Sequence, residues 1–130
     1  GSPALPRILK RALFMSERKD SDFLSDIQEA IRRAVNYTAG MAYDTFLSDT
    51  KTQDAVIRNL EIIGEATKNL SSELRARYPD LPWKSMAGAR DRLIHDYFGV
   101  NLDIVWEIVV IELPKVISRL EGIQDSEIDE

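Results

Sequence analysis

Residues 56–70, with the sequence VIRNLEIIGEATKNL, carry the strongest structural signal in the chain. Apolar or small side chains recur there at intervals of three or four residues: Val56, Leu60, Ile63, Thr67 and Leu70. Such spacing lines up one face of an α-helix, so it predicts an amphipathic helix with one buried side. We expect this helix to begin after Thr50 and to end before Tyr78, because Pro79 disfavours a helical conformation in the residue that precedes it.

The same periodicity precedes this stretch. A first helix is predicted from Asp22 to about Thr38, with Ser21 and Asp22 as candidate caps at its start and Gly40 near its end. Its buried face would carry Leu24, Ile27, Ile31, Ala34 and Val35. The pattern therefore predicts two long amphipathic helices in the first half of the chain.

The sequence of the second half of the chain predicts two more helices. Pro82 suits the first turn of a third helix, which we expect to end near Tyr97 to Gly99. Asn101 can cap a fourth helix that continues to Leu120. Pro114 lies inside it and is expected to kink or break it, because proline lacks the N–H group that the helix needs.

These patterns predict an all-α fold, an antiparallel bundle of four main helices with short connections. No strand-like alternation persists beyond a few residues. The chain has 130 residues, of which 44% are hydrophobic, and a chain of this length buries only a modest core. Excess apolar surface on two of the helices favours a homodimer.

The ends of the chain differ from its middle. Gly1-Ser2 is typical of a cleaved expression tag, and Met15 is a plausible natural start. We interpret residues 1–14 as a tag remnant or an N-terminal extension, residues 15–122 as one helical domain and residues 123–130 as an acidic, frayed tail.

The composition excludes several kinds of site. The chain has no cysteine and one histidine, His95, which excludes thiolate sites and any metal site that needs two histidines from one chain. Glu61 and Glu65 share a helix face, but the facing ligands of a carboxylate metal site are absent. We expect no metal and no other catalytic cofactor. The absence of cysteine also fits a cytoplasmic protein. No apolar run is long enough to span a membrane.

The charge is unevenly distributed. The last ten residues hold five acids and no base, which accounts for the net charge of −5. Between Arg75 and His95, five basic residues accompany only Asp80 and Asp91. The chain therefore lacks the general basic excess of a polyanion-binding domain, but it could hold a few phosphates at one place. Ordinary solvated charge is the simpler interpretation of the composition alone.

The stretch Arg90-Asp-Arg-Leu-Ile-His95-Asp-Tyr97 has the residue types that RNA cleavage requires. Arginine presents a planar fork of donors to a phosphate, and histidine moves protons near neutral pH. RNA carries its own nucleophile, the 2′-hydroxyl, so cleavage needs no metal if proton transfer and charge stabilisation are supplied. Asp91 lies four residues before His95 and could orient its imidazole.

A single regular helix does not bring Arg90 and His95 together into such a site. Arg90 and His95 are five residues apart, which is roughly 140° around an ideal helix. A twofold dimer could pair the arginine and histidine of both subunits in one cleft. Before any family is considered, a lone histidine near a helix end is more often a cap or a surface group than a catalyst.

Three stretches resemble one known family in their order and spacing. The string Arg90-Asp-Arg-Leu-Ile-His95-Asp-Tyr97-Phe-Gly is similar to the R-x4-6-H signature of the HEPN superfamily, in the R-x4-H-x-Y form of the HepT-like toxins. The stretches Arg58-Asn-Leu-Glu-Ile-Ile-Gly-Glu-Ala66 and Pro82-Trp-Lys-Ser-Met-Ala-Gly88 resemble the same family. The resemblance covers about Asp22 to Leu120.

The resemblance implies a dimeric helical bundle that acts as a metal-independent endoribonuclease toxin of a type VII-like toxin–antitoxin pair. By position, Arg90 and His95 would be the catalytic pair. Asp91 would support His95, at a position where relatives often have asparagine. The implied antitoxin is an MntA-like minimal nucleotidyltransferase, which would use ATP to transfer AMP to Tyr97.

Two other interpretations remain open. The chain could be a non-catalytic binding or regulatory subunit of a nucleotidyltransferase complex, as its balanced charge and the acidic Asp91 allow. It could also be a purely structural helical dimer. For Tyr97, a packing role stands beside the role of AMP acceptor.

Overall fold

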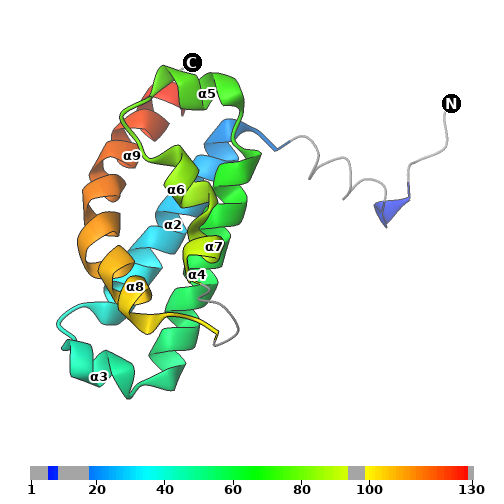
Figure 1. Cartoon of the computed structure of the whole chain (residues 1–130). Helices are drawn as coiled ribbons and strands as arrows, with labels where there is room; N and C mark the ends of the chain where they lie inside the picture. Colours follow the sequence, from blue (N-terminus) through cyan, green and yellow to red (C-terminus); the bar gives the residue numbers. More distant parts are fainter. Residues whose placement is uncertain (1–5, 9–17, 94–98, 129–130) are drawn as a thin grey trace, which may run out of the picture.

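The computed structural model describes residues 6–8, 18–93 and 99–128. Three long helices, α2 (Asp20–Thr38), α4 (Thr50–Asn69) and α9 (Leu113–Ile128), form the body of the molecule (Figure 1). Helix α2 lies between the other two and runs in the opposite direction to both. The described residues contain no strand, so the predicted all-α fold is confirmed.

Short helical elements connect and cover the long ones. Helices α6 (Trp83–Ala87) and α7 (Ala89–Leu93) follow one another along α4 and pack against it (Figure 1). The remaining elements are α3 (Tyr43–Leu47), α5 (Ser72–Arg77), α8 (Leu102–Glu107) and the π-helical turn η1 (Ile108–Glu112). The four predicted helical segments therefore exist, although only the first is a single uninterrupted helix.

The core is one continuous apolar cluster between these helices. The periodic positions predicted for α2 and α4 are buried, except that Val35 is only partly buried, and Thr67 donates its hydroxyl to the carbonyl of Ile63 at 2.7 Å. The fully or almost fully buried large side chains of the cluster are Leu24, Ile27, Ile31, Phe46, Val56, Leu60, Ile63, Leu74, Leu93, Val105, Leu120 and Ile123.

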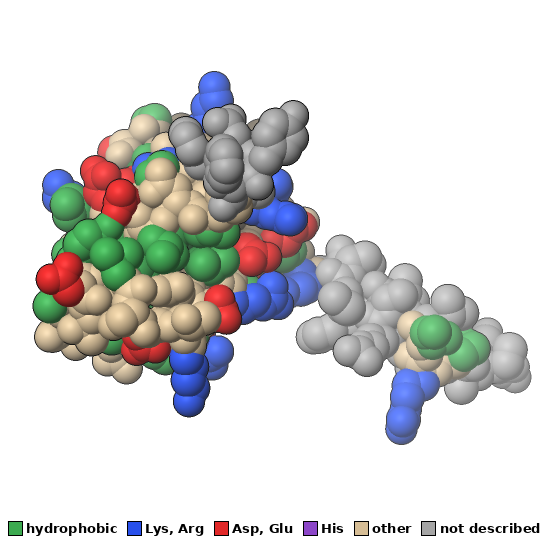
Figure 2. Space-filling view, turned by 60° about the horizontal axis from the view of Figure 1, so that its bottom comes forward, with side chains coloured by type: hydrophobic (Ala, Val, Ile, Leu, Met, Phe, Trp, Pro, Cys, Tyr) green, Lys and Arg blue, Asp and Glu red, His purple; other side chains and the backbone are tan. Residues whose placement is uncertain are grey.

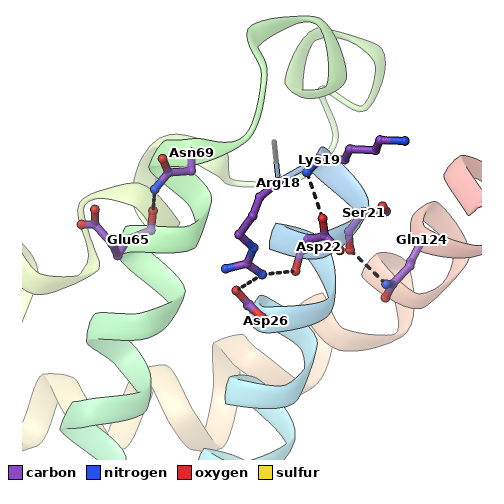
Figure 3. A network of polar contacts seen from close by, with 8 residues as sticks. All are labelled: Arg18, Lys19, Ser21, Asp22, Asp26, Glu65, Asn69 and Gln124. Atoms are coloured by element: carbon purple, nitrogen blue, oxygen red, sulfur yellow. Dashed lines mark hydrogen bonds and ion pairs between the residues drawn. The ribbon is translucent and has the colours of Figure 1, made fainter. Parts of the chain in front are cut away.

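The start of α2 is held by polar contacts with its own first turns and with α9 (Figure 3). The backbone N–H of Lys19 donates to Asp22 at 2.9 Å, and the guanidinium of Arg18 pairs with Asp26 at 2.7 Å. The amide of Gln124 donates to the carbonyl of Ser21 at 3.2 Å. Helix α2 begins at Asp20, two residues earlier than predicted, with Lys19 as its capping residue, so Ser21 is not the cap and Asp22 lies within the first turn.

The predicted second helix is interrupted. Leu70 has an extended backbone, and a new helix, α5, begins after Ser71, whose hydroxyl accepts from the N–H of Leu74 at 3.1 Å. The carboxylate of Asp20 accepts from the N–H of Ser71 at 2.8 Å and from its hydroxyl at 2.5 Å. A side chain 51 residues away thus stabilises the break, which the local sequence pattern does not reveal.

The predicted third helix is divided at Gly88, which separates α6 from α7. The fourth helical segment was predicted to kink or break at Pro114, and it does not break there, because the chain stays helical through the proline. The chain forms the π-helical turn η1 before the proline instead, and the N–H of Leu113 donates to the carbonyl of Ile108, five residues earlier. A wider turn accommodates a residue that has no N–H and whose ring crowds the preceding turn.

The last helix is longer than predicted. Residues 123–128, which the sequence analysis assigned to a frayed tail, continue α9. Ile123 is fully buried, and the hydroxyl of Tyr78 donates to Glu127 at 2.8 Å. The apolar side chain and this contact with the loop after α5 account for the extension. Among the described residues, no helix is both long enough and apolar enough to cross a membrane.

Candidate active site

The structure places the two described members of the predicted site on α7. Arg90 and Asp91 are both exposed, and neither makes a side-chain hydrogen bond or an ion pair with another described residue. His95 and Tyr97 lie outside the described residues, so their distance from Arg90 is not part of the structure. The exposed guanidinium of Arg90 is available to a phosphate from solvent.

Apolar contacts hold one side of α7. Ala89 and Leu93, at its two ends, are buried. Gly64 of α4 allows a close approach here, because a Cβ atom at that position would lie 3.4 Å from the carbonyl oxygen of Ala87 and 3.9 Å from the Cβ of Ala89. The glycine of the 58–66 motif therefore lies where α4 meets the junction of α6 and α7.

An ion pair holds another side of α7. The two terminal nitrogens of Arg92 donate to the two carboxylate oxygens of Glu112, at 3.1 and 2.9 Å. These hydrogen bonds are the main cause of a raised pKa for Arg92. No feature of the sequence points to Glu112, since the two residues are 20 positions apart and no motif joins them.

The chain returns to the end of α7 at Asn101. The carbonyl of Leu93 accepts from the N–H of Asn101 at 2.7 Å. The side-chain oxygen of Asn101 accepts from the N–H groups of Asp103 and Ile104, which confirms the predicted cap of the fourth helical segment. Gly99 has a positive φ of 86°, a conformation that glycine adopts without strain. The two ends of the segment 94–98 are thus joined by a backbone hydrogen bond.

The loop before α6 is fixed to α9. The guanidinium of Arg119 donates to both carboxylate oxygens of Asp80, at 2.6 and 3.3 Å, which lowers the pKa of Asp80. Arg119 also lies over the ring of Tyr78, 5.5 Å from its centre. The indole N–H of Trp83 donates to the carbonyl of Tyr78 at 2.8 Å. These contacts determine where α6 begins and so where α7 follows.

Apolar side chains are also exposed on other parts of the bundle. Val110 and Ile111 of η1 are 44% and 51% exposed, and Val100 is 39% exposed. Figure 2 shows hydrophobic side chains in a band across the end of the bundle that α3 and α8 form. A groove of about 240 Å³ lies between α2 and η1, lined by residues that include Val35, Trp106, Val110 and Pro114. Exposed apolar patches of this kind mark contact surfaces.

Metal ligands do not gather in the described part of the chain. No group of three or more acidic, histidine or cysteine side chains is positioned there to hold an ion. Glu61 and Glu65 lie beside a groove between α2 and α4, together with Arg18 and Arg58, so each carboxylate has basic side chains nearby.

Comparison with known proteins gives a consistent assignment. Residues 27–123 match the HepT-like family, described as Ribonuclease HepT-like. The chain is 50% identical over 101 residues to "Putative RNase MJ0127" of Methanocaldococcus jannaschii, covering 78% of this chain and 84% of the relative. It is 43% identical over 108 residues to "Probable ribonuclease HepT" of Thermococcus cleftensis, covering 83% and 98%.

A bacterial protein is also similar. The chain is 39% identical over 105 residues to "Putative RNase TTE0752" of Caldanaerobacter subterraneus, covering 81% of this chain and 94% of the relative. No solved structure shows a significant similarity to the chain. The family match covers most of the chain, and the relatives are matched over most of their own length. The chain therefore belongs to the ribonuclease HepT-like family of the HEPN superfamily.

Proposed function

We propose that the chain is a metal-independent endoribonuclease, the toxin of a type VII-like toxin–antitoxin pair that acts in the cytoplasm. The proposal rests on one observation, the exposed position of Arg90 in this HepT-like chain. The first residue of the R-x4-H signature is exposed and unpaired among the described residues, on a helix held by buried neighbours. An arginine in that state has its five donors available for a phosphate.

The chemistry assigns one role to each residue. His95 takes the proton of the 2′-hydroxyl as that oxygen bonds to phosphorus. The bond from phosphorus to the 5′-oxygen breaks, and the leaving oxygen receives a proton from a second histidine. Arg90 stabilises the charge that develops on the phosphoryl oxygens. Asp91 supports the imidazole of His95.

A homodimer supplies the second histidine. One chain has a single histidine, and on an ideal helix a spacing of five positions would turn the side chains of Arg90 and His95 roughly 140° apart. A twofold axis near α7 brings both pairs into one cleft. The exposed Val110 and Ile111 give such a dimer an apolar contact surface.

The proposed partner is an MntA-like nucleotidyltransferase antitoxin. It transfers AMP from ATP to the hydroxyl of Tyr97, and pyrophosphate leaves. The added phosphate places bulk and negative charge two residues from His95, which excludes an RNA phosphate. The test is incubation of the dimer with the partner and ATP. We expect one AMP per chain by intact mass, absent in Tyr97→Phe, and a loss of RNA cleavage.

The nuclease proposal is tested with purified tRNA, mRNA and rRNA in the presence of EDTA. Intact mass first establishes that the wild type and His95→Ala carry no AMP. We expect cleavage by the wild type and none by His95→Ala. Equal cleavage by both would remove His95 from the mechanism, and no cleavage by the unmodified wild type would refute the nuclease.

One observation favours a second function. Asp91 places an exposed carboxylate beside Arg90, where it would repel an RNA phosphate. A chain of this kind could instead dock the nucleotidyltransferase without cleaving RNA. Stable complex formation without growth arrest on expression would support this alternative, whereas arrest that Arg90→Ala abolishes would support the toxin.

A further inference from the structure

The described part of α7 contains five residues, from Ala89, which follows Gly88, to Leu93. Short helices in proteins are stabilised mainly by packing against other elements and only weakly by their own propensity. Its direction therefore depends on contacts with other elements. On an ideal helix, the buried Ala89 and Leu93 lie within about 40° of each other, so they define only one side.

Arg92 and Arg90 lie on opposite flanks of that buried side. Each residue turns an ideal helix by about 100°, so Arg92 lies roughly 60° to one side of the buried residues around the helix axis. Arg90 lies at a similar angle on the other side. A contact that holds Arg92 therefore limits rotation of α7 about its axis. Rotation is the motion that would move Arg90 towards or away from a bound phosphate.

Arg92 has such a contact in Glu112. Two parallel hydrogen bonds join the planar guanidinium to the planar carboxylate, at 3.1 and 2.9 Å, and this paired geometry limits rotation as well as distance. Both side chains are only partly exposed, at 36% for Arg92 and 38% for Glu112. The pair lies beside a small cavity of about 30 Å³ that Ala89, Met86 and Leu113 help to line.

The direction of Glu112 depends on the π-helical turn. Glu112 is the last residue of η1, next to the buried Leu113, and Val109 is buried within the same turn. A π-helical turn contains one residue more than an α-helical turn, so it changes the facing of its neighbours by up to about 100°. Pro114 thus influences where Glu112 points, although it is itself exposed and far from Arg90 in sequence.

We infer that Glu112 is a positioning residue for Arg90, which acts by holding Arg92 and so fixing the rotation of α7. The inference rests on the proposed nuclease function, because the orientation of Arg90 matters only if Arg90 meets a phosphate. It assigns a role in cleavage to a residue outside the R-x4-H signature. Glu112 acts on Arg90 through Arg92, and Pro114 influences the π-helical turn that sets the direction of Glu112.

The test compares Glu112→Gln with Glu107→Gln. Glu107 is an exposed acid on the adjoining helix that also interacts electrostatically with Arg92 but makes no hydrogen bond to it among the described contacts. Both variants remove one negative charge near Arg92, and only Glu112→Gln disrupts the paired hydrogen bonds. We expect kcat of RNA cleavage to fall about 10- to 100-fold in Glu112→Gln with KM changed less than about twofold. Glu107→Gln should match the wild type.

Two further variants separate positioning from stability. Arg92→Lys keeps the charge but replaces the planar fork by a point charge, so kcat should fall while the urea unfolding midpoint stays close to that of the wild type. The exchange Arg92→Glu with Glu112→Arg should recover most of the lost kcat. Unchanged cleavage in both Glu112→Gln and Arg92→Lys would overturn the inference, as would an equal loss in Glu107→Gln.

Amide hydrogen exchange tests the positioning independently of cleavage. We expect the amides of Arg90 to Leu93 to exchange faster in Glu112→Gln than in Glu107→Gln, because α7 loses a constraint. If the wild type cleaves no RNA, the proposed function fails while this comparison still reports on α7. Equal exchange in the two variants would show that Glu112 does not hold the helix.

Discussion

Helices α2 and α4 contain 19 and 20 residues, whereas each of the four elements from α6 to η1 contains five or six. We call α2 and α4 the long-helix pair and the elements α6 to η1 the short-helix side. The long-helix pair is held by periodic apolar packing. The short-helix side also depends on specific contacts, among them the ion pair of Arg92 with Glu112 and the close approach at Gly64.

This difference predicts that the two regions contribute to different properties of the protein, the long-helix pair to its stability and the short-helix side to RNA cleavage. The long-helix pair contributes more buried side chains to the core than the short-helix side does, and it presents no residue of the R-x4-H signature. The short-helix side carries Arg90 on α7, whose described part is held by contacts with α4 and by the ion pair of Arg92 with Glu112. Mutations in the long-helix pair should therefore affect the free energy of unfolding, and mutations on the short-helix side should affect cleavage by the folded protein.

The largest expected effect on stability comes from Ile27→Ala. Ile27 is fully buried on α2, so its truncation should lower the free energy of unfolding by about 2 to 5 kcal/mol, measured by urea denaturation. Cleavage per folded molecule should stay at the wild-type value. A loss of cleavage larger than the loss of folded protein would contradict the separation of the two regions.

A bulkier residue at position 64 should affect both regions. Gly64→Val adds atoms beyond a Cβ that already lies 3.4 Å from the carbonyl of Ala87, so it should destabilise the fold by about 1 to 3 kcal/mol. It should also lower cleavage, because α6 and α7 must move. The control is Gly64→Ala, whose single methyl fits at ordinary contact distance and which gains helix propensity of up to about 1 kcal/mol. Equal stability of the two variants would refute the close approach.

The break between α4 and α5 should respond to removal of its cap. Ser71→Ala loses the hydroxyl that accepts from Leu74 and donates to Asp20, so the free energy of unfolding should fall by about 1 kcal/mol. Ser72→Ala, at an exposed neighbour, is the control. Thermal or urea unfolding of both variants measures the difference. The cap would have no role if the two curves coincided.

The smallest effect is expected at Asp80, and it should depend on pH. The hydrogen bond from Arg119 lowers the pKa of Asp80 in the folded chain. The charged carboxylate therefore stabilises the fold above the ordinary aspartate pKa of about 3.9, and this contribution is lost as the pH falls through the lowered value. Asp80→Asn should be less stable than the wild type at pH 7. The difference should shrink below about pH 4, and a constant difference across this range would contradict the assignment.

The long-helix pair could be predicted because its information is local. Three- and four-residue spacing in 24–35 and 56–70 is enough to place both helices and their buried faces. The end of α4 could not be predicted, because Ser71 becomes a cap partly through Asp20, which is distant in sequence. The three- and four-residue apolar pattern continues from α4 into α5, so it does not indicate the break between them.

The sequence motifs predicted the family, which the comparisons show, whereas the assignment of Arg90 and His95 to the active site stays a prediction. The contacts that hold the helix of Arg90 have no signal in the sequence. The role of Glu112 could not be predicted, since it depends on a π-helical turn whose position follows from the packing of Val109 and Leu113 as well as from Pro114. The sequence predicted a kink or a break at Pro114, and the chain stays helical there and forms this π-helical turn before the proline.

The measurement that tests the account most directly is RNA cleavage in EDTA by Arg90→Ala and Arg33→Ala, each paired with a urea unfolding curve. Arg33 is an exposed arginine on α2 that pairs only with Glu29 among the described contacts, so it controls for the loss of one positive charge. We predict that cleavage falls about 100-fold or more in Arg90→Ala, with the unfolding midpoint unchanged, and stays at the wild-type rate in Arg33→Ala. Wild-type cleavage by Arg90→Ala, or an equal loss in both variants, would contradict the assignment of the active site to α7.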